Sequence, residues 1–210
     1  MERRDDPRDA EGLERRWRIV VGGHRGDDAL VRGSAGDPDP VVRAARLGAL
    51  ERLGDLSVDQ LAEALCDPDA RVRRRAAVLA ARVRGKGSRS RLPSLLCDRL
   101  SDEDPLVAEA AAWALGEKRH RGSVVALASM AAEHADPRCR EAAIAALGAI
   151  GDPSGLSAVL GALDDRPALR RRAVVALAGF DGPEVDDALQ TCLTDTDWQV
   201  RQAAEILLGR

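Results

Sequence analysis

Apolar residues recur with helical spacing along most of the chain, in paired segments separated by aspartate-containing turns. Before the turns, apolar residues stand four positions apart, as at Leu61/Leu65, Leu96/Leu100 and Leu189/Leu193. After the turns, Ala-rich stretches such as the one holding Val42, Ala45, Ala49 and Leu53 place apolar residues on one helical face. The two-residue alternation of a half-buried strand is absent from this pattern. The pattern therefore predicts an all-α protein made of helical hairpins.

The turn and the helix that follows it repeat six times along the sequence. The repeats read DPDPVVRAARLGAL from Asp37, DPDARVRRRAAVLA from Asp67, DEDPLVAEAAAWAL from Asp102, DPRCREAAIAAL from Asp136, DRPALRRRAVVAL from Asp165 and DTDWQVRQAAEILL from Asp195. Five of them contain an apolar residue followed by Arg, at Arg43, Arg73, Arg140, Arg170 and Arg201. The third has Val107-Ala108 instead. A hairpin of about 30 residues cannot bury its own apolar face, so these units are expected to stack into an α-solenoid of about six hairpins.

Aspartate followed by proline marks where helices are expected to begin. An Asp side chain accepts hydrogen bonds from the free N–H groups of a first helical turn, and a following Pro has no N–H to leave unpaired. Asp39-Pro40 and Asp104-Pro105 should therefore begin second helices of hairpins, and Asp152-Pro153 a first helix.

The repeated pattern D-P-D-x-x-V-R-x-A-A-x-x-A-L, over about residues 28–210, resembles HEAT repeats, and among them the short HEAT-like repeats named after phycobilisome lyases. The resemblance implies an armadillo-like helical solenoid that serves mainly as a binding scaffold. It also implies a ladder in which an aspartate of one turn pairs with an arginine of an adjacent unit. The ladder residues would be Asp37, Asp67, Asp102, Asp136, Asp165 and Asp195 with Arg43, Arg73, Arg140, Arg170 and Arg201.

The domain organisation follows from where the repeats begin. Residues 1–11 are rich in charge and are expected to form a disordered tail, and residues 12–210 a single repeat domain. The stretch 20–26, VVGGHRG, is interpreted as a loop that breaks the first helix pair. Trp113 and Trp198 are expected to pack between repeats.

Composition excludes several classes of protein. The formal net charge of −3 gives no global field that would steer the chain to nucleic acid or to an anionic membrane. No run of about 18 apolar residues predicts a membrane-spanning helix, and the charged start does not look like a secretory signal. Cys66, Cys97, Cys139 and Cys192 are too widely spaced for a zinc motif, so we expect reduced thiols in a cytoplasmic protein.

Motifs of catalysis are lacking in the sequence. HEAT-repeat hydroxylases hold iron with His-Glu dipeptides, and this chain has none. It also lacks a P-loop and a Gly-x-Ser-x-Gly nucleophile elbow. We therefore expect no cofactor, no metal and no catalytic residues.

One segment departs from the neutral average. No acidic residue occurs from Ala70 to Cys97, and the segment contains Arg71, Arg73, Arg74, Arg75, Arg82, Arg84, Lys86, Arg89 and Arg91. These residues either pair with the acidic third repeat or bind an acidic partner. In the helix after Asp69, we expect Val72, Ala76, Leu79, Ala80 and Val83 to face the core, with Arg73, Arg74 and Arg82 outside or flanking it.

Three functions remain open at this stage. The first is a non-catalytic scaffold that binds another protein in a groove lined by the second helices. The second is a nucleic-acid-binding protein that uses the Arg71–Arg91 cluster. The third, implied by the resemblance alone, is a lyase-like enzyme or enzyme subunit of the bilin-lyase type.

Overall fold

A computed structural model describes residues 7–83 and 91–209, without the side chains of residues 7–10 and of Asp28. All regular structure in these ranges is helical, which confirms the predicted all-α class. The helices are α1 (Pro7–Arg25), α2 (Asp28–Gly33), α3 (Pro40–Leu53), α4 (Val58–Ala64), α5 (Ala70–Arg82), α6 (Leu92–Asp98), α7 (Pro105–Glu117), α8 (Val124–Glu133), α9 (Pro137–Ile150), α10 (Leu156–Gly161), α11 (Pro167–Leu177), α12 (Pro183–Cys192) and α13 (Trp198–Leu207). Short 3₁₀ turns precede or follow some of them: η2 (Arg99–Ser101), η3 (Arg121–Ser123), η4 (Pro153–Gly155) and η5 (Ala162–Asp164).

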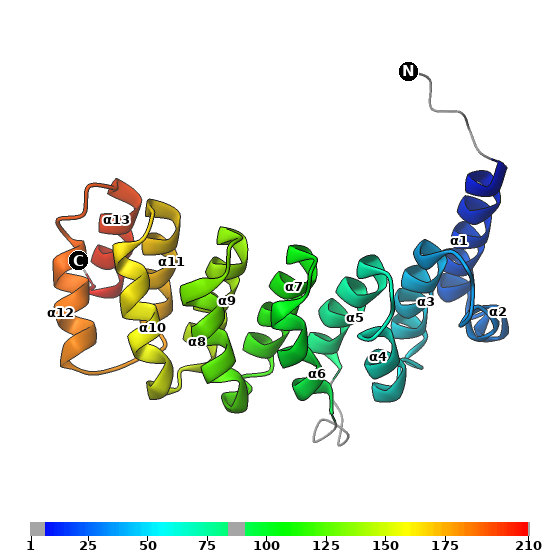
Figure 1. Cartoon of the computed structure of the whole chain (residues 1–210), viewed down its shortest axis with the longest axis horizontal. Helices are drawn as coiled ribbons and strands as arrows, with labels where there is room; N and C mark the ends of the chain where they lie inside the picture. The colour runs from blue at the N-terminus through cyan, green and yellow to red at the C-terminus, as the bar shows by residue number, and fades with distance from the viewer. Residues whose placement is uncertain (1–6, 84–90, 210) are drawn as a thin grey trace. The chain divides into compact units, whose positions relative to one another are not determined.

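The chain divides into two compact units, Met1–Leu92 and Pro93–Arg210, here called the N-terminal and C-terminal units. In the N-terminal unit, α1, α3 and α5 pack side by side, with α2 and α4 against them. In the C-terminal unit, α7, α9, α11 and α13 form one layer and α8, α10 and α12 lie in a second (Figure 1). Each unit is thus a stack of helical hairpins, the solenoid arrangement that the repeats predict. The expectation of one domain over residues 12–210 stays a prediction.

Aspartate caps begin most second helices. The side chains of Asp39, Asp69, Asp104 and Asp136 each accept a hydrogen bond from the backbone N–H two residues on. Prolines occupy the first helical position after three of these caps, at Pro40, Pro105 and Pro137. These starts agree with the capping pattern of the sequence.

Small residues let adjacent second helices approach closely. A methyl group added at Gly116 would lie 2.8 Å from the Cα of Ala146, and one added at Gly148 would lie 2.7 Å from the Cα of Ala176. Buried Leu and Val side chains fill the space between the two layers, for example Leu115, Leu147 and Leu177. At these two glycines the backbones of adjacent second helices come into contact.

The start of the chain differs from its prediction. α1 begins at Pro7, inside the expected tail of residues 1–11, while residues 1–6 lie outside the described residues. The interpretation of 20–26 as a loop is wrong, because α1 continues through Gly22 and Gly23 to Arg25. A methyl group at Gly23 would lie 2.9 Å from the Cα of Ala49, so this glycine serves helix packing against α3.

Candidate functional site: the face of the second helices

The Asp-Arg pairs of the turns come together in both units. In the N-terminal unit, Arg43 donates through Nε and Nη2 to both carboxylate oxygens of Asp67, at 2.9 and 2.8 Å. In the C-terminal unit, Arg170 contacts Asp195 in the same bidentate way, at 2.8 and 2.7 Å, and Arg140 lies 3.1 Å from Asp165. Each arginine stands three residues after its helix start and reaches the turn of the following hairpin.

A further pair of this kind was missed in the sequence. Nε of Arg15, in α1, donates to Asp37 at 3.1 Å. Arg15 is preceded by Glu14, so the apolar-Arg pattern does not mark it. The pair shows that α1 occupies the place of a second helix in the N-terminal unit.

The first aspartate of a turn also organises its own turn. Asp67 accepts a hydrogen bond from the N–H of Asp69 at 2.9 Å, and Asp195 accepts one from Asp197 at 2.7 Å. Burial raises the pKa of Asp67, but the hydrogen bonds from Arg43 and Asp69 outweigh it and hold the pKa below its ordinary value. Hydrogen bonds from Arg170 likewise lower the pKa of Asp195.

Asp136 has a different place from the other turn aspartates. It is the N-cap of α9 and forms an ion pair with Arg138, two residues on, at 2.8 Å. The position that corresponds to Asp67 is held by His134, whose Nδ1 accepts the N–H of Asp136 at 3.0 Å. The preceding helix carries Ala108 where others carry Arg. Both partners of one pair are therefore replaced together between α7 and α9.

The remaining predicted ladder residues contact their own turns. Nη1 of Arg73 donates to the carbonyls of Asp67 and Pro68, and Nη1 of Arg201 donates to those of Asp195 and Thr196. Asp102 accepts the N–H of Asp104 and lies 3.5 Å from Arg99. An arginine at this position thus ties the helix to the turn before it.

The predicted basic cluster is only partly available at the surface. Arg73 is 5% exposed, so its assignment to a partner-binding surface is wrong, and of the two places expected for it only the one flanking the core fits. Arg71 pairs with its own cap Asp69 at 2.8 Å, and Arg82 pairs with Glu51 at 3.2 Å. Arg74 and Arg91 are exposed, and Arg84, Lys86 and Arg89 lie outside the described residues. The core residues expected for this helix are buried, except Val83, which is half-buried.

An apolar row crosses the second helices of the C-terminal unit. Trp113, Ala145, Val175 and Ile206 each stand eight residues after the first residue of α7, α9, α11 and α13. Trp113 is 40%, Val175 51% and Ile206 68% exposed. Trp198, at the start of α13, is 60% exposed. Both tryptophans were expected to pack between repeats, and the structure leaves them open to solvent instead.

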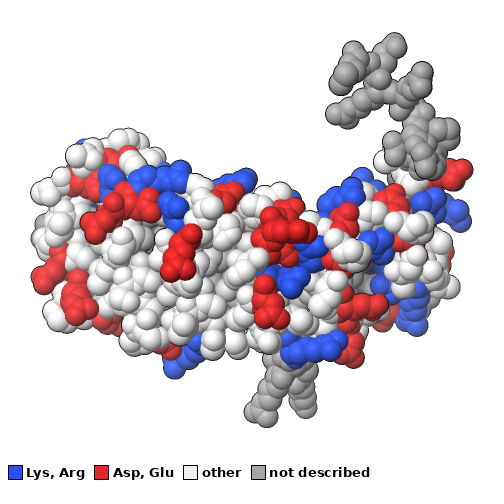
Figure 2. All heavy atoms as spheres, viewed as in Figure 1, with Lys and Arg blue, Asp and Glu red and all other residues white. Residues whose placement is uncertain are grey.

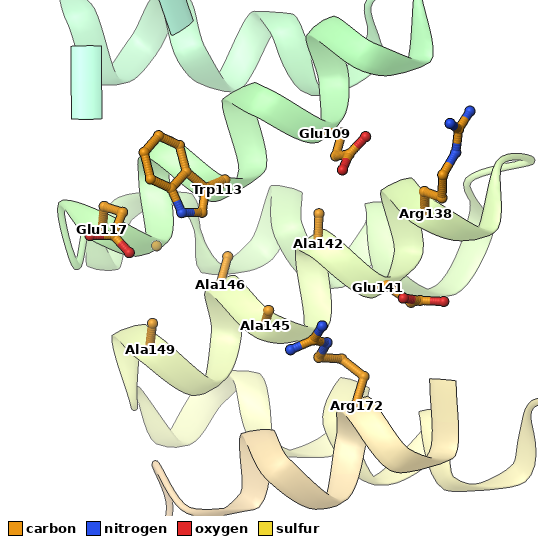
Figure 3. Close-up of a pocket in the computed structure, with 11 residues that line it drawn as sticks. Glu109, Trp113, Glu117, Arg138, Glu141, Ala142, Ala145, Ala146, Ala149 and Arg172 are labelled. Atoms are coloured by element: carbon orange, nitrogen blue, oxygen red, sulfur yellow. The ribbon is translucent and has the colours of Figure 1, made fainter. Parts of the chain in front are cut away.

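A hollow of about 360 Å³ lies beside Trp113, lined by α7, α9 and one residue of α11. Its floor is made of alanines, Ala142, Ala145, Ala146 and Ala149, which keep the surface low between the helices (Figure 3). Charged side chains stand around it: Glu109, Glu117, Arg138, Glu141 and Arg172. Among the described residues, no ion pair engages Glu109, Glu117 or Glu141. This arrangement offers an exposed indole, a shallow apolar floor and free carboxylates.

The opposite layer of this unit differs in character. α8 has one charged residue, Glu133, and α10 has none. Figure 2 shows this part of the surface as a nearly uncharged area. Val125 of α8 is 80% exposed there.

The described part of the chain contains no group of three His, Cys, Asp or Glu side chains that could hold a metal ion. Burial raises the pKa of the Cys139 thiol to about 11, which makes it a poor nucleophile. Within the same residues, no helix has the length and hydrophobicity needed to cross a membrane. The geometry of the Trp113 surface suits binding.

Comparisons with known proteins agree with the fold. Residues 92–169 match the family model of HEAT repeats. No curated protein matches the sequence significantly.

Solved structures resemble the whole chain at low sequence identity. YibA of Escherichia coli is 20% identical, with 99% of this chain and 76% of YibA covered at a TM-score of 0.66. A designed armadillo repeat protein in complex with the peptide (KR)4 is 17% identical, with 91% and 97% covered at a TM-score of 0.60. Human deoxyhypusine hydroxylase is 21% identical, with 94% and 78% covered at a TM-score of 0.51.

These likenesses show the fold, and the family model identifies the repeats. The narrower assignment to the phycobilisome-lyase type stays a prediction. Residues 92–169 thus match HEAT repeats, and the described part of the chain has an armadillo-like helical fold.

Proposed function

We propose that the chain is a non-catalytic scaffold that binds a segment of another protein on the second-helix face of its C-terminal unit. The observation that carries this proposal is the exposure of Trp113, Val175 and Ile206, which stand at equivalent positions of α7, α11 and α13. Exposed apolar patches rimmed by polar side chains mark interaction sites, because a partner that covers them removes apolar surface from water. We further propose a cytoplasmic location, because four widely spaced cysteines suit a reducing compartment.

Trp113 is the expected anchor of this surface. Tryptophan is enriched among residues that dominate binding energy, and a shallow hollow beside it gives a partner side chain somewhere to insert. The alanine floor adds apolar area without blocking access. A designed protein of similar fold binds a peptide, which supports the idea that stacked second helices can present such a surface.

The test is a selection of peptides from a random library displayed on phage, with the wild-type protein as target. The selected peptides are then titrated against Trp113→Ala and against the control Val125→Ala, which removes an exposed apolar side chain from α8 in the other layer. We expect Trp113→Ala to weaken binding by about 30-fold, as for a hot-spot residue, and Val125→Ala by less than about two-fold.

Two outcomes would contradict the proposal. In the first, selected peptides bind wild-type protein and Trp113→Ala equally well. In the second, Val125→Ala abolishes their binding, which would assign the interaction to the uncharged surface of α8 and α10.

A further inference from the structure

A second surface lies on α3 and α5, in the N-terminal unit, and it centres on Arg75. The guanidinium of Arg75 covers Gly48 of α3. A methyl group added at Gly48 would lie 3.3 Å from Cζ and 3.4 Å from Nε of Arg75. Because Gly48 has no side chain, the guanidinium of Arg75 can lie directly against the backbone of α3.

The charges around the Arg75 guanidinium do not balance. Glu51 is the acidic neighbour of Arg75, and its Oε1 already accepts a hydrogen bond from Arg82 at 3.2 Å. Arg52 and Arg82 both act on Arg75 as like charges. The carboxylate beside Arg75 is thus already engaged by Arg82, and within the described residues Arg75 itself takes part in no ion pair.

Burial adds to the cost of this arrangement. Burial has the largest effect on the pKa of Arg75 and lowers it. The like charges of Arg52 and Arg82 lower this pKa further, whereas Glu51 raises it. A half-buried arginine without its own carboxylate gains from an added anion, because the anion replaces the lost solvation and offsets the repulsion. The planar guanidinium also binds a carboxylate through two parallel hydrogen bonds.

We propose that Arg75, together with Arg52 and Arg82, binds an acidic side chain in a peptide segment of a partner protein. The surroundings favour a peptide over a nucleic acid. Glu51 stands inside the cluster and Asp69 already neutralises Arg71, so a continuous path for phosphates is lacking. Half-buried Val41 and Val78, on the same two helices, supply apolar contact for neighbouring residues of a peptide.

This site belongs to α3 and α5 alone and is independent of the Trp113 surface. A failure of one proposal therefore leaves the other standing. The two surfaces also differ in charge, since arginines predominate around Arg75 and glutamates around Trp113.

The probe for the test is a fluorescein-labelled peptide of alternating Glu and Ala, about eight residues long, followed by fluorescence anisotropy at about 50 mM salt to limit screening. We expect saturable binding to the full chain. Arg75→Gln should weaken it by about five-fold or more, as expected for loss of a charge-assisted hydrogen-bonded pair. The control Arg25→Gln removes the same charge from exposed α1 and should change binding by less than about two-fold.

Gly48→Ala provides a variant that keeps every charge. Its methyl group takes the space of the Arg75 guanidinium, so we expect binding to weaken while circular dichroism shows unchanged helicity. This variant decides the question if Arg75→Gln fails to fold.

Several results would overturn the proposal. These are a lack of saturation with wild-type protein, binding by Gly48→Ala as tight as that of wild type, and an equal loss of affinity in Arg25→Gln and Arg75→Gln. Tighter binding of an oligothymidylate of about 20 nucleotides, with a steep salt dependence, would assign the surface to nucleic acid instead.

Discussion

At the scale of single residues, the carboxylate of Asp67 combines two structural roles. Asp67 receives the N–H of Asp69 within its own turn and both donor groups of Arg43 from the preceding second helix. The same carboxylate thereby shapes a turn and joins two hairpins. Its pKa is held below the ordinary value, which means that the folded state favours the ionised form.

Asp67→Ala is expected to lower the free energy of unfolding at pH 7 by about 1.5–3 kcal/mol, the range for hydrogen bonds to charged groups. A carboxyl with a depressed folded pKa stabilises above its unfolded pKa, and this contribution disappears as the pH falls through the folded pKa. The difference between wild type and variant should therefore be fully present above the ordinary Asp pKa of about 4 and shrink as the pH falls below it. Urea titrations at a series of pH values measure it.

Asp55→Ala serves as the control for this variant. Asp55 pairs with Arg32 at an exposed site, where both side chains are 40% exposed or more. Such a pair contributes about 0–1 kcal/mol, so the control should unfold nearly as wild type does. A loss of stability equal in the two variants would refute a special role for Asp67.

At the scale of helices, close packing depends on glycines, which have no side chain to hold the helices apart. Gly116 faces Ala146 and Gly148 faces Ala176, and in both cases backbone meets backbone. The helices α7, α9 and α11 are held in register by these contacts together with the Arg140–Asp165 pair. That register aligns Trp113, Ala145 and Val175 in one row.

Gly148→Ala tests this close packing. Alanine is the better helix former, by about 1 kcal/mol, so propensity alone predicts stabilisation. We expect the opposite, a loss of about 1–3 kcal/mol, because the added methyl group meets the backbone of Ala176 and the helices must separate. Thermal unfolding followed by circular dichroism gives the sign.

The matched control is Gly161→Ala in α10. A methyl group there meets nothing within 4 Å, so the variant should be neutral or slightly more stable. If Gly148→Ala behaves as Gly161→Ala does, the close approach of α9 and α11 is not needed for stability.

At the scale of the whole molecule, the two units differ in charge although the chain is nearly balanced. Residues 1–92 contain 20 Lys and Arg against 16 Asp and Glu, whereas residues 93–210 contain 12 against 19. The small net charge of the whole chain is thus the sum of a basic N-terminal unit and an acidic C-terminal unit. Their second-helix faces follow the same division, with Arg75 on one and Glu109, Glu117 and Glu141 on the other.

The C-terminal unit is expected to fold by itself. In a stack of repeats, each unit is stabilised by its neighbours, and α7 to α13 contain several such interfaces. A fragment of residues 93–210 should be helical, unfold in one cooperative transition and keep the peptide binding of the Trp113 surface. Circular dichroism and peptide titration check both.

A shorter fragment provides the comparison. Residues 93–151 retain fewer interfaces between second helices, so this fragment should melt at a lower temperature. Equal melting temperatures, or an unfolded 93–210 fragment, would contradict this account of its stability.

The sequence by itself determined the class of fold and the local starts of its helices. Helical periodicity, aspartate caps and a repeat of about 30 residues act through neighbouring residues, and these signals are readable without knowing which helices touch. Pairing between turn aspartates and arginines of adjacent units was implied only by the resemblance to HEAT-like repeats, and the structure matches Arg43 with Asp67. Asp136 was misplaced because its turn has lost the first aspartate, and only the hydrogen bond to His134 identifies the substitution.

Tertiary structure alone decided which residues are open to a partner. Exposure depends on what the adjacent helices cover, and no local pattern records it. Arg73 looked like a surface charge yet is buried against its own turn, and Trp113 looked like core yet lies on an open face. Gly23 looked like a loop residue, but it serves contact between α1 and α3. The candidate surfaces are formed by residues far apart in sequence. Packing of the helices in register aligns residues that each stand eight positions after a helix start, and it places the Arg75 guanidinium over Gly48.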